Sequence, residues 1–171
     1  MYVRLYYVRT VEAGEPAIYL FDCSYKHKEA GARVNESRGT ACLVQSGTFS
    51  TAAVPLEIAE RDWTELMIAE KVDMGQSPLA ENFLALSQDP ATAMQIVNAS
   101  VQSVLLEHMQ NQLYNPVRVT IGPGGAVILT CRTREPDRLQ DLIQLAHQLE
   151  AAVGYYRYRS RKQEGAVVLH F

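Results

Sequence analysis

Apolar residues concentrate in three segments near the start of the chain, and polar or glycine-containing stretches separate them. Residues 2–8, 17–25 and 40–45 are rich in aromatic and β-branched side chains, so each segment predicts a β-strand. The polar stretch 26–36 predicts a solvated hairpin loop between the second and third strands.

The pattern is mixed in the next part of the chain. Residues 53–58 predict a short strand, and Pro55 favours a sheet edge because proline donates no backbone hydrogen bond. Residues 59–71 have apolar side chains near helical spacing and predict a short helix, whereas residues 83–86 predict a strand. The loop at 73–78 is where a boundary between two halves of the chain would fall.

The clearest helical signal begins at Asp89-Pro90, which is typical of an N-cap followed by proline in the first turn. Side chains at spacings of three and four form one stripe. The stripe consists of Met94, Val97, Val101, Val104, Leu105, His108 and Met109. Asn115-Pro116 ends the segment, so we predict a helix from about 90 to 111.

A β-hairpin and a second long helix follow. Alternation over residues 117–121, the Gly-Pro-Gly-Gly sequence at 122–125 and the apolar run 126–131 predict the hairpin. A phosphate-binding loop would need a helix after the glycines, and here a strand follows. A stripe from Leu139 to Val153 predicts the helix at about 136–153.

Gly154 is placed to end that helix, and residues 155–159 and 165–171 are then predicted to pair as a C-terminal β-hairpin. Hairpins with few helices are typical of an antiparallel sheet with helices packed on it. The chain of 171 residues, 47% hydrophobic and 20% charged, fits one α+β domain over residues 1–171, with a sub-boundary near 73–78.

Charge and cysteine content argue against nucleic-acid binding and against a zinc or disulfide framework. The net charge of −3 provides no overall basic field for binding nucleic acid. No apolar run is long enough to cross a membrane, so membrane association would need an anchor in a longer natural chain. Cys23, Cys42 and Cys131 match no zinc or disulfide spacing, and we expect buried, reduced thiols in a cytoplasmic setting.

Candidate catalytic groups are sparse. On a strand, Cys23 and His27 would share a face but stand about 13 Å apart, too far to exchange a proton directly. An enzyme would need at least two of Cys23, His27, Cys131, His108 and Asp22 within about 4 Å. No histidine spacing predicts a metal site, and we expect no cofactor.

The acidic pairs along the chain have a simpler explanation. Glu57 with Glu60, and Asp137 with Asp141, all fall on faces that the pattern predicts to be polar. Solvated faces of this kind need no catalytic role, so we assign these carboxylates to the surface.

A tyrosine- and arginine-rich segment near the C-terminus is the candidate interaction surface. It comprises Tyr156, Arg157, Tyr158, Arg159, Arg161 and Lys162. Such a segment can stack on single-stranded nucleic acid, dock an acidic protein surface, or simply keep an edge strand soluble. The negative charge of the whole chain argues against nucleic acid.

One resemblance emerges from the pattern of strands and caps. The run Leu20 to Tyr25, the strand Thr40 to Val44, the run Val54 to Glu57 and the stretch Asn82 to Pro90 carry it. Together they resemble the soluble α+β domain of bacterial proteins of unknown function that usually follows membrane-spanning helices. Cys23 stands where those proteins have an aromatic residue, and the resemblance implies a fold but no catalytic residue.

We therefore expect a non-enzymatic binding or scaffold module that contacts a protein partner or a second copy of itself. Two alternatives stay open. One is a small enzyme whose site is assembled from distant segments, and the other is a nucleic-acid binder that uses the C-terminal Tyr/Arg segment.

Overall fold

Three long strands begin the fold because their aromatic and β-branched residues suit a pleated sheet. The computed structural model describes residues 3–12, 16–28, 34–51, 55–60, 70–110 and 118–164. Strands β1 (Val3–Glu12), β2 (Ala17–Lys28) and β3 (Val34–Gln45) pair antiparallel, as predicted. The hairpin loop at 26–36 is shorter than predicted, because β2 and β3 continue pairing from Lys26–Glu36 to Lys28–Val34.

The other described strands join the same sheet. They are β4 (Leu56–Glu60), β5 (Glu70–Lys71), β6 (Phe83–Ser87), β7 (Arg118–Gly122) and β8 (Gly125–Cys131). The eight strands lie in the order β1-β2-β3-β8-β7-β4-β6-β5, and every pairing between them is antiparallel. The predicted α+β class with a mainly antiparallel sheet is confirmed.

The prediction of an edge position for the strand after Pro55 is wrong. β4 lies between β6 and β7 and pairs with both. Pro55 stands just before the first ladder residue, Leu56, so its missing N–H costs no hydrogen bond in the sheet. The helix predicted at 59–71 is wrong at both ends, because residues 59–60 belong to β4 and residues 70–71 form β5. The residues between them, 61–69, lie outside the described part of the chain.

The helix predicted at 90–111 is two helices, α2 (Pro90–Ile96) and α3 (Ala99–Gln110). The break falls at Asn98, whose side-chain oxygen accepts hydrogen bonds from the N–H groups of Ser100 and Val101 at 2.8 and 3.1 Å. This Asn cap starts a new helix and changes the helical phase. Ala93 and Ile96 therefore face the core, whereas Met94, which we placed on the buried stripe, is 52% exposed.

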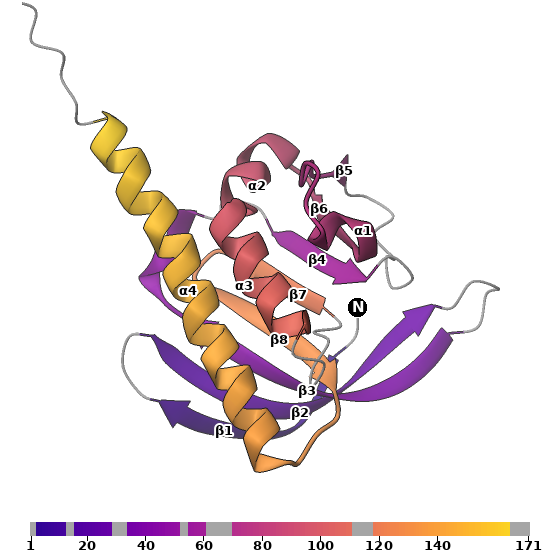
Figure 1. The fold of residues 1–171 in the computed structure, drawn as a ribbon. Helices are drawn as coiled ribbons and strands as arrows, with labels where there is room; N and C mark the ends of the chain where they lie inside the picture. The colour runs from indigo at the N-terminus through magenta and orange to yellow at the C-terminus, as the bar shows by residue number, and fades with distance from the viewer. Residues whose placement is uncertain are drawn as a thin grey trace, which may run out of the picture.

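Helix α4 (Pro136–Glu164) covers one face of the sheet, with α3 beside it (Figure 1). Leu142, Leu145 and Leu149 of α4 are fully buried. They pack in a core with residues of the sheet, of the 3-10 turn η1 (Gly47–Thr51) and of the short helix α1 (Leu79–Asn82). The core contains residues from both sides of the loop at 73–78.

The C-terminal hairpin predicted after Gly154 is wrong in its first strand. Residues 155–159 belong to α4, which runs for 29 residues to Glu164. Gly154 lies inside the helix, at a point where Thr48 packs closely: the Thr48 methyl carbon is 3.2 Å from where a Cβ would stand. The predicted second strand, 165–171, lies outside the described residues.

A substitution at Gly125 tests the close approach of β8 to β3. A Cβ at this position would lie 2.6 Å from the carbonyl oxygen of Val44, so Gly125→Ala forces the two strands apart. We expect a loss of about 1–3 kcal/mol in the free energy of unfolding, measured by urea denaturation. Gly122→Ala is the control, because a Cβ there meets nothing within 4 Å. Equal stabilities of the two variants would contradict the strand packing.

Candidate functional site

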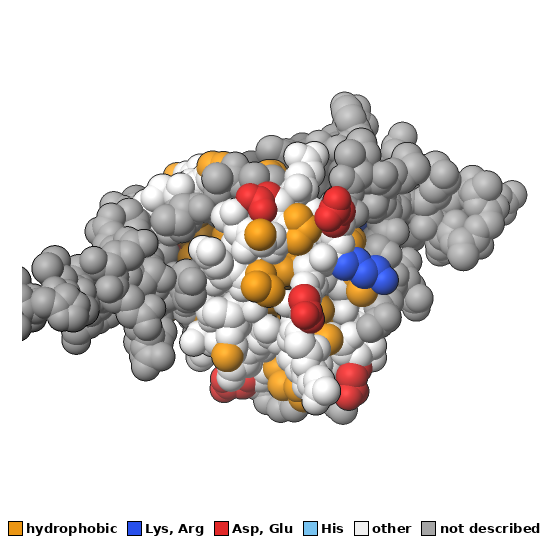
Figure 2. Space-filling model, turned by 90° about the horizontal axis from the view of Figure 1, so that it is seen from above, with side chains coloured by type: hydrophobic (Ala, Val, Ile, Leu, Met, Phe, Trp, Pro, Cys, Tyr) orange, Lys and Arg blue, Asp and Glu red, His pale blue; other side chains and the backbone are white. Residues whose placement is uncertain are grey.

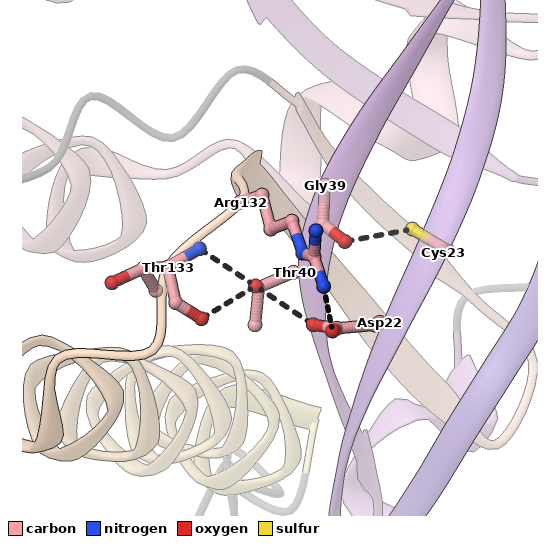
Figure 3. Close-up of polar contacts among 6 residues, drawn as sticks. All are labelled: Asp22, Cys23, Gly39, Thr40, Arg132 and Thr133. Carbon is pink, nitrogen blue, oxygen red and sulfur yellow. Dashed lines mark hydrogen bonds and ion pairs between the residues drawn. The ribbon is translucent and has the colours of Figure 1, made fainter.

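A polar cluster lies where β2, β3 and β8 approach the start of α4 (Figure 3). The Thr40 hydroxyl accepts a hydrogen bond from the Thr133 N–H at 3.0 Å. The same hydroxyl lies 3.2 Å from the Thr133 carbonyl oxygen and 3.3 Å from Asp22 Oδ1, so its single proton can serve either acceptor. Arg132 pairs with Asp22 at 3.4 Å. The cluster fastens the segment that leads into α4.

Cys23 adjoins this cluster but is held as a protonated thiol. Its Sγ donates to the carbonyl oxygen of Gly39 at 3.6 Å, and the residue is 1% exposed. Burial, and secondly the negative charge of Asp22, raise the pKa of the Cys23 thiol above its ordinary value. A nucleophilic cysteine needs the opposite, an environment that stabilises the thiolate.

Two of the other proposed catalytic groups, Cys131 and His108, lie apart from Cys23. Cys23 and Cys131 are both paired with Gly39, one from β2 and one from β8, so two strand spacings of about 5 Å each separate them. His108 lies in the last turn of α3, on the helical side of the sheet. Cys23 packs with Ala41 and Leu129 in a small separate cluster. The side chain of His27 is not among those that the structure describes.

The expectation that all three cysteines are buried is wrong for one of them. Cys23 and Cys42 are buried, whereas Cys131 is exposed. Cys131 is the last residue of β8, where the sheet gives way to the loop before α4, and this position exposes it.

An ion pair within the sheet was not expected from the sequence. Glu57 Oε1 and Arg118 Nε are 2.7 Å apart, with side chains only 14% and 11% exposed. Glu57 is therefore not a solvated carboxylate as predicted. The two residues occupy diagonal positions, since Glu57 pairs with Thr120 and Arg118 pairs with Ala59. Only the strand register, which the sequence does not state, would have revealed the pair.

A second set of hydrogen bonds, which we call the Glu150 latch, holds α4 near its middle. Glu150 Oε1 accepts hydrogen bonds from the hydroxyl groups of Ser46 at 2.7 Å and Thr48 at 2.5 Å. Hydrogen bonds to a carboxylate are among the stronger ones in proteins. Together with Thr48 packing on Gly154, this latch fixes the direction in which α4 leaves the sheet.

The predicted interaction residues lie on the continuation of that helix. Tyr156, Arg157, Tyr158, Arg159, Arg161 and Lys162 all have helical backbone in α4. Their side chains lie outside the described ones, so their role as an interaction surface stays a prediction. Figure 1 shows this part of α4 running beyond the sheet and away from α2.

The described residues contain neither a metal-binding cluster nor a membrane-spanning helix. Among the side chains that the structure describes, no three or more His, Cys, Asp or Glu residues gather in a way that would hold a metal ion. Within the same residues, no helix combines the length and the apolar character that a membrane span requires.

Comparison with known proteins identifies a shared fold. No protein-family model matches the chain, and no curated protein matches it in sequence. The crystal structure of the mycobacterial trehalose monomycolate transport factor A, TtfA, is similar, with a TM-score of 0.53. The match covers 88% of this chain and 86% of that chain at 6% sequence identity, which establishes likeness of fold alone.

The partly buried His108 gives a pH dependence of stability. Burial lowers the pKa of His108 below its ordinary value near 6.5, and the negative charge of Asp141 partly opposes the shift. The unfolded chain therefore takes up a proton at this position more readily than the folded chain. Stability should fall as the pH drops below about 6.5 and level off below the folded-state pKa.

Two substitutions check this assignment by urea denaturation between about pH 5 and pH 8. His108→Gln should flatten the acid-side loss of stability. Asp141→Asn should extend the loss to lower pH, because it removes the carboxylate that opposes the shift. An unchanged pH profile in His108→Gln would show that another group is responsible.

Proposed function

We propose that this chain is a non-enzymatic binding or scaffold module that contacts an acidic protein surface through residues 155–164 of α4, the basic helix end. The observation that carries the proposal is the unbroken course of α4. Its first half is held by Leu142, Leu145 and the Glu150 latch, and its second half continues past the sheet. At the rise of an α-helix, ten residues extend this arm by about 15 Å.

The composition of the basic helix end favours a polar, acidic partner. It contains three arginines and one lysine against one glutamate, together with three tyrosines. Arginine and tyrosine are enriched at the energetic centres of protein interfaces. The segment has no aliphatic residue, Phe or Trp, so it lacks the apolar face with which a helix binds a membrane surface.

The rest of the molecule supports a platform role. The transport factor TtfA has a similar fold, and an accessory function in transport is compatible with a module that binds other proteins. The chain as a whole carries a net charge of −3, which disfavours nucleic acid as the partner. The buried cysteines Cys23 and Cys42 suit a reducing, cytoplasmic setting.

Site-specific photo-crosslinking in cells of the source organism tests the proposal. A benzoylphenylalanine replaces Tyr156 or Tyr158 in the basic helix end, and Gln144, an exposed position earlier in α4, is the control site. We expect a discrete protein crosslink from positions 156 and 158 that is absent from position 144. No crosslink from the helix end would contradict the proposal, and so would a nuclease-sensitive crosslink.

The affinity for the crosslinked partner, purified and titrated with this chain, then measures the charge contribution. R157Q/R159Q should weaken binding at least about tenfold, because each lost cation costs part of the electrostatic complementarity. R134Q/R138Q, which removes one arginine just before α4 and one in its first turn, should bind like the unmodified chain. Equal losses in both variants would indicate non-specific charge attraction.

A further inference from the structure

Strand β1 forms one edge of the eight-stranded sheet, at the end farthest from β5 (Figure 1). It pairs with β2 along its inner side, and among the strands that the structure describes none pairs with its outer side. A sheet edge presents a row of backbone N–H and C=O groups that a further strand can bind. At ten residues, β1 is long enough to receive such a strand along most of its length.

The opposite edge of the sheet, β5, is protected against strand addition. It has only two residues, Glu70 and Lys71, and both are exposed. Figure 2 views the molecule from this end and shows red carboxylates and a blue cationic side chain among the orange apolar ones. Proteins commonly block a sheet edge with a very short strand, lysine or proline. β1 is long and contains neither lysine nor proline, so it is the edge suited to pairing.

The register between β1 and β2 places four residues of β1 on one face of the sheet. Directly paired residues of antiparallel strands lie on the same face, and residues two apart along β2 share a face. The four pairs are Arg4 with Ser24, Tyr7 with Asp22, Arg9 with Leu20 and Glu12 with Ile18. Ile18 belongs to the core that the helices cover, so this is the helical face of the sheet.

The β1 strand of a second copy complements this outer side in one antiparallel register. When a two-fold axis passes through Val8, Arg4 of each copy stands level with Glu12 of the other, and Tyr7 stands level with Arg9. Opposite charges at directly opposed positions stabilise a strand pair, and arginine opposite tyrosine allows a cation–π attraction. We infer that two copies of this chain pair through β1 in this register, by strand addition.

The neighbouring registers lose these matches. An axis through Arg9 places Arg9 of both copies opposite each other, and like charges at opposed positions destabilise the pair. An axis through Tyr7 places the two arginines of β1 opposite uncharged residues, Thr10 and Leu5. An axis between two residues would oppose a hydrogen-bonding position to a non-bonding one. The order of residues in β1 therefore favours a single register.

Two irregular steps in β1 agree with the same register. β1 shifts against β2 between Leu5 and Tyr7, and again between Thr10 and Glu12. About an axis through Val8, each step of one strand lies opposite the other step of its partner, so both strands change phase at the same place. The pairing is isologous and closes at two copies. It joins two eight-stranded sheets into one, with the helices of both copies on the same face.

Sedimentation velocity of the full chain and of charge-reversed variants tests the inference. The unmodified chain should shift from monomer to dimer as its concentration rises. R4E and E12R each set like charges opposite each other at both ends of the strand pair, so each variant alone should dimerise about tenfold more weakly. An equal mixture of the two variants, and the double variant R4E/E12R, should regain the dimer, because opposite charges are opposed again.

Two control variants make the same charge changes at the other edge of the sheet. K71E and E70R alter the exposed residues of β5 and should dimerise like the unmodified chain. A monomer at every concentration would overturn the inference, and so would a dimer that R4E and E12R leave unchanged. A mixture of R4E and E12R that stays monomeric would overturn the register.

Cysteine crosslinking locates the two-fold axis directly. The substitutions are made in C131S, because Cys131 is exposed and could crosslink by itself. V8C places two thiols at opposed positions, where the Cα atoms are about 4.5–5.5 Å apart and a disulfide can form. T10C is the control, because its counterpart lies four residues along the partner strand, about 13 Å away. Mild oxidation should give a covalent dimer of V8C, and an equal or faster crosslink from T10C would overturn the register.

The β1 edge and the basic helix end are separate parts of the chain, so this inference and the proposed function can fail independently. R157Q/R159Q should dimerise like the unmodified chain, and R4E should keep the photo-crosslinks from positions 156 and 158. Loss of the dimer in R157Q/R159Q would assign self-association to the helix end and overturn the pairing through β1.

Discussion

The packing of α4 against the sheet is the contact on which the rest of the structure depends. Three leucines of its first half are fully buried, and Glu150 accepts hydroxyl hydrogen bonds from Ser46, just before η1, and from Thr48 within η1. The Thr40 and Thr133 cluster fixes the start of the same helix. Because α4 is anchored at its start and near its middle, its remaining turns are aimed in one direction without needing a core of their own.

The sheet and the first half of α4 could be predicted from the sequence because their signals are local. Strand residues alternate or are β-branched, and the stripe from Leu142 to Leu149 repeats at helical spacing. The errors arose where a distant contact decides the outcome. A glycine after an apolar stripe predicts a helix end, but Gly154 is the site where Thr48 approaches the helix closely. Three tyrosines then favoured a strand, although a helix already nucleated by packing continues easily.

The candidate site was harder to predict than the fold. Glu57 and Arg118 lie far apart in the sequence, and only the β4–β7 register brings them together at diagonal positions. Met94 fits the stripe of a single long helix, and the cap at Asn98 removes it from that stripe. Composition singles out the residues of the basic helix end as a candidate surface, which stays a prediction, and the element that carries them is a helix and not the predicted strand.

The central claim is that α4 continues as one helix through residues 155–164 and presents its cationic residues beyond the sheet. The most direct measurement is the set of NMR Cα secondary shifts of these residues, recorded on the dilute chain at high salt. The account predicts positive, helical shifts that continue from Val153 to the last turn before Glu164. Shifts near zero, or the negative values of an extended strand, would contradict it.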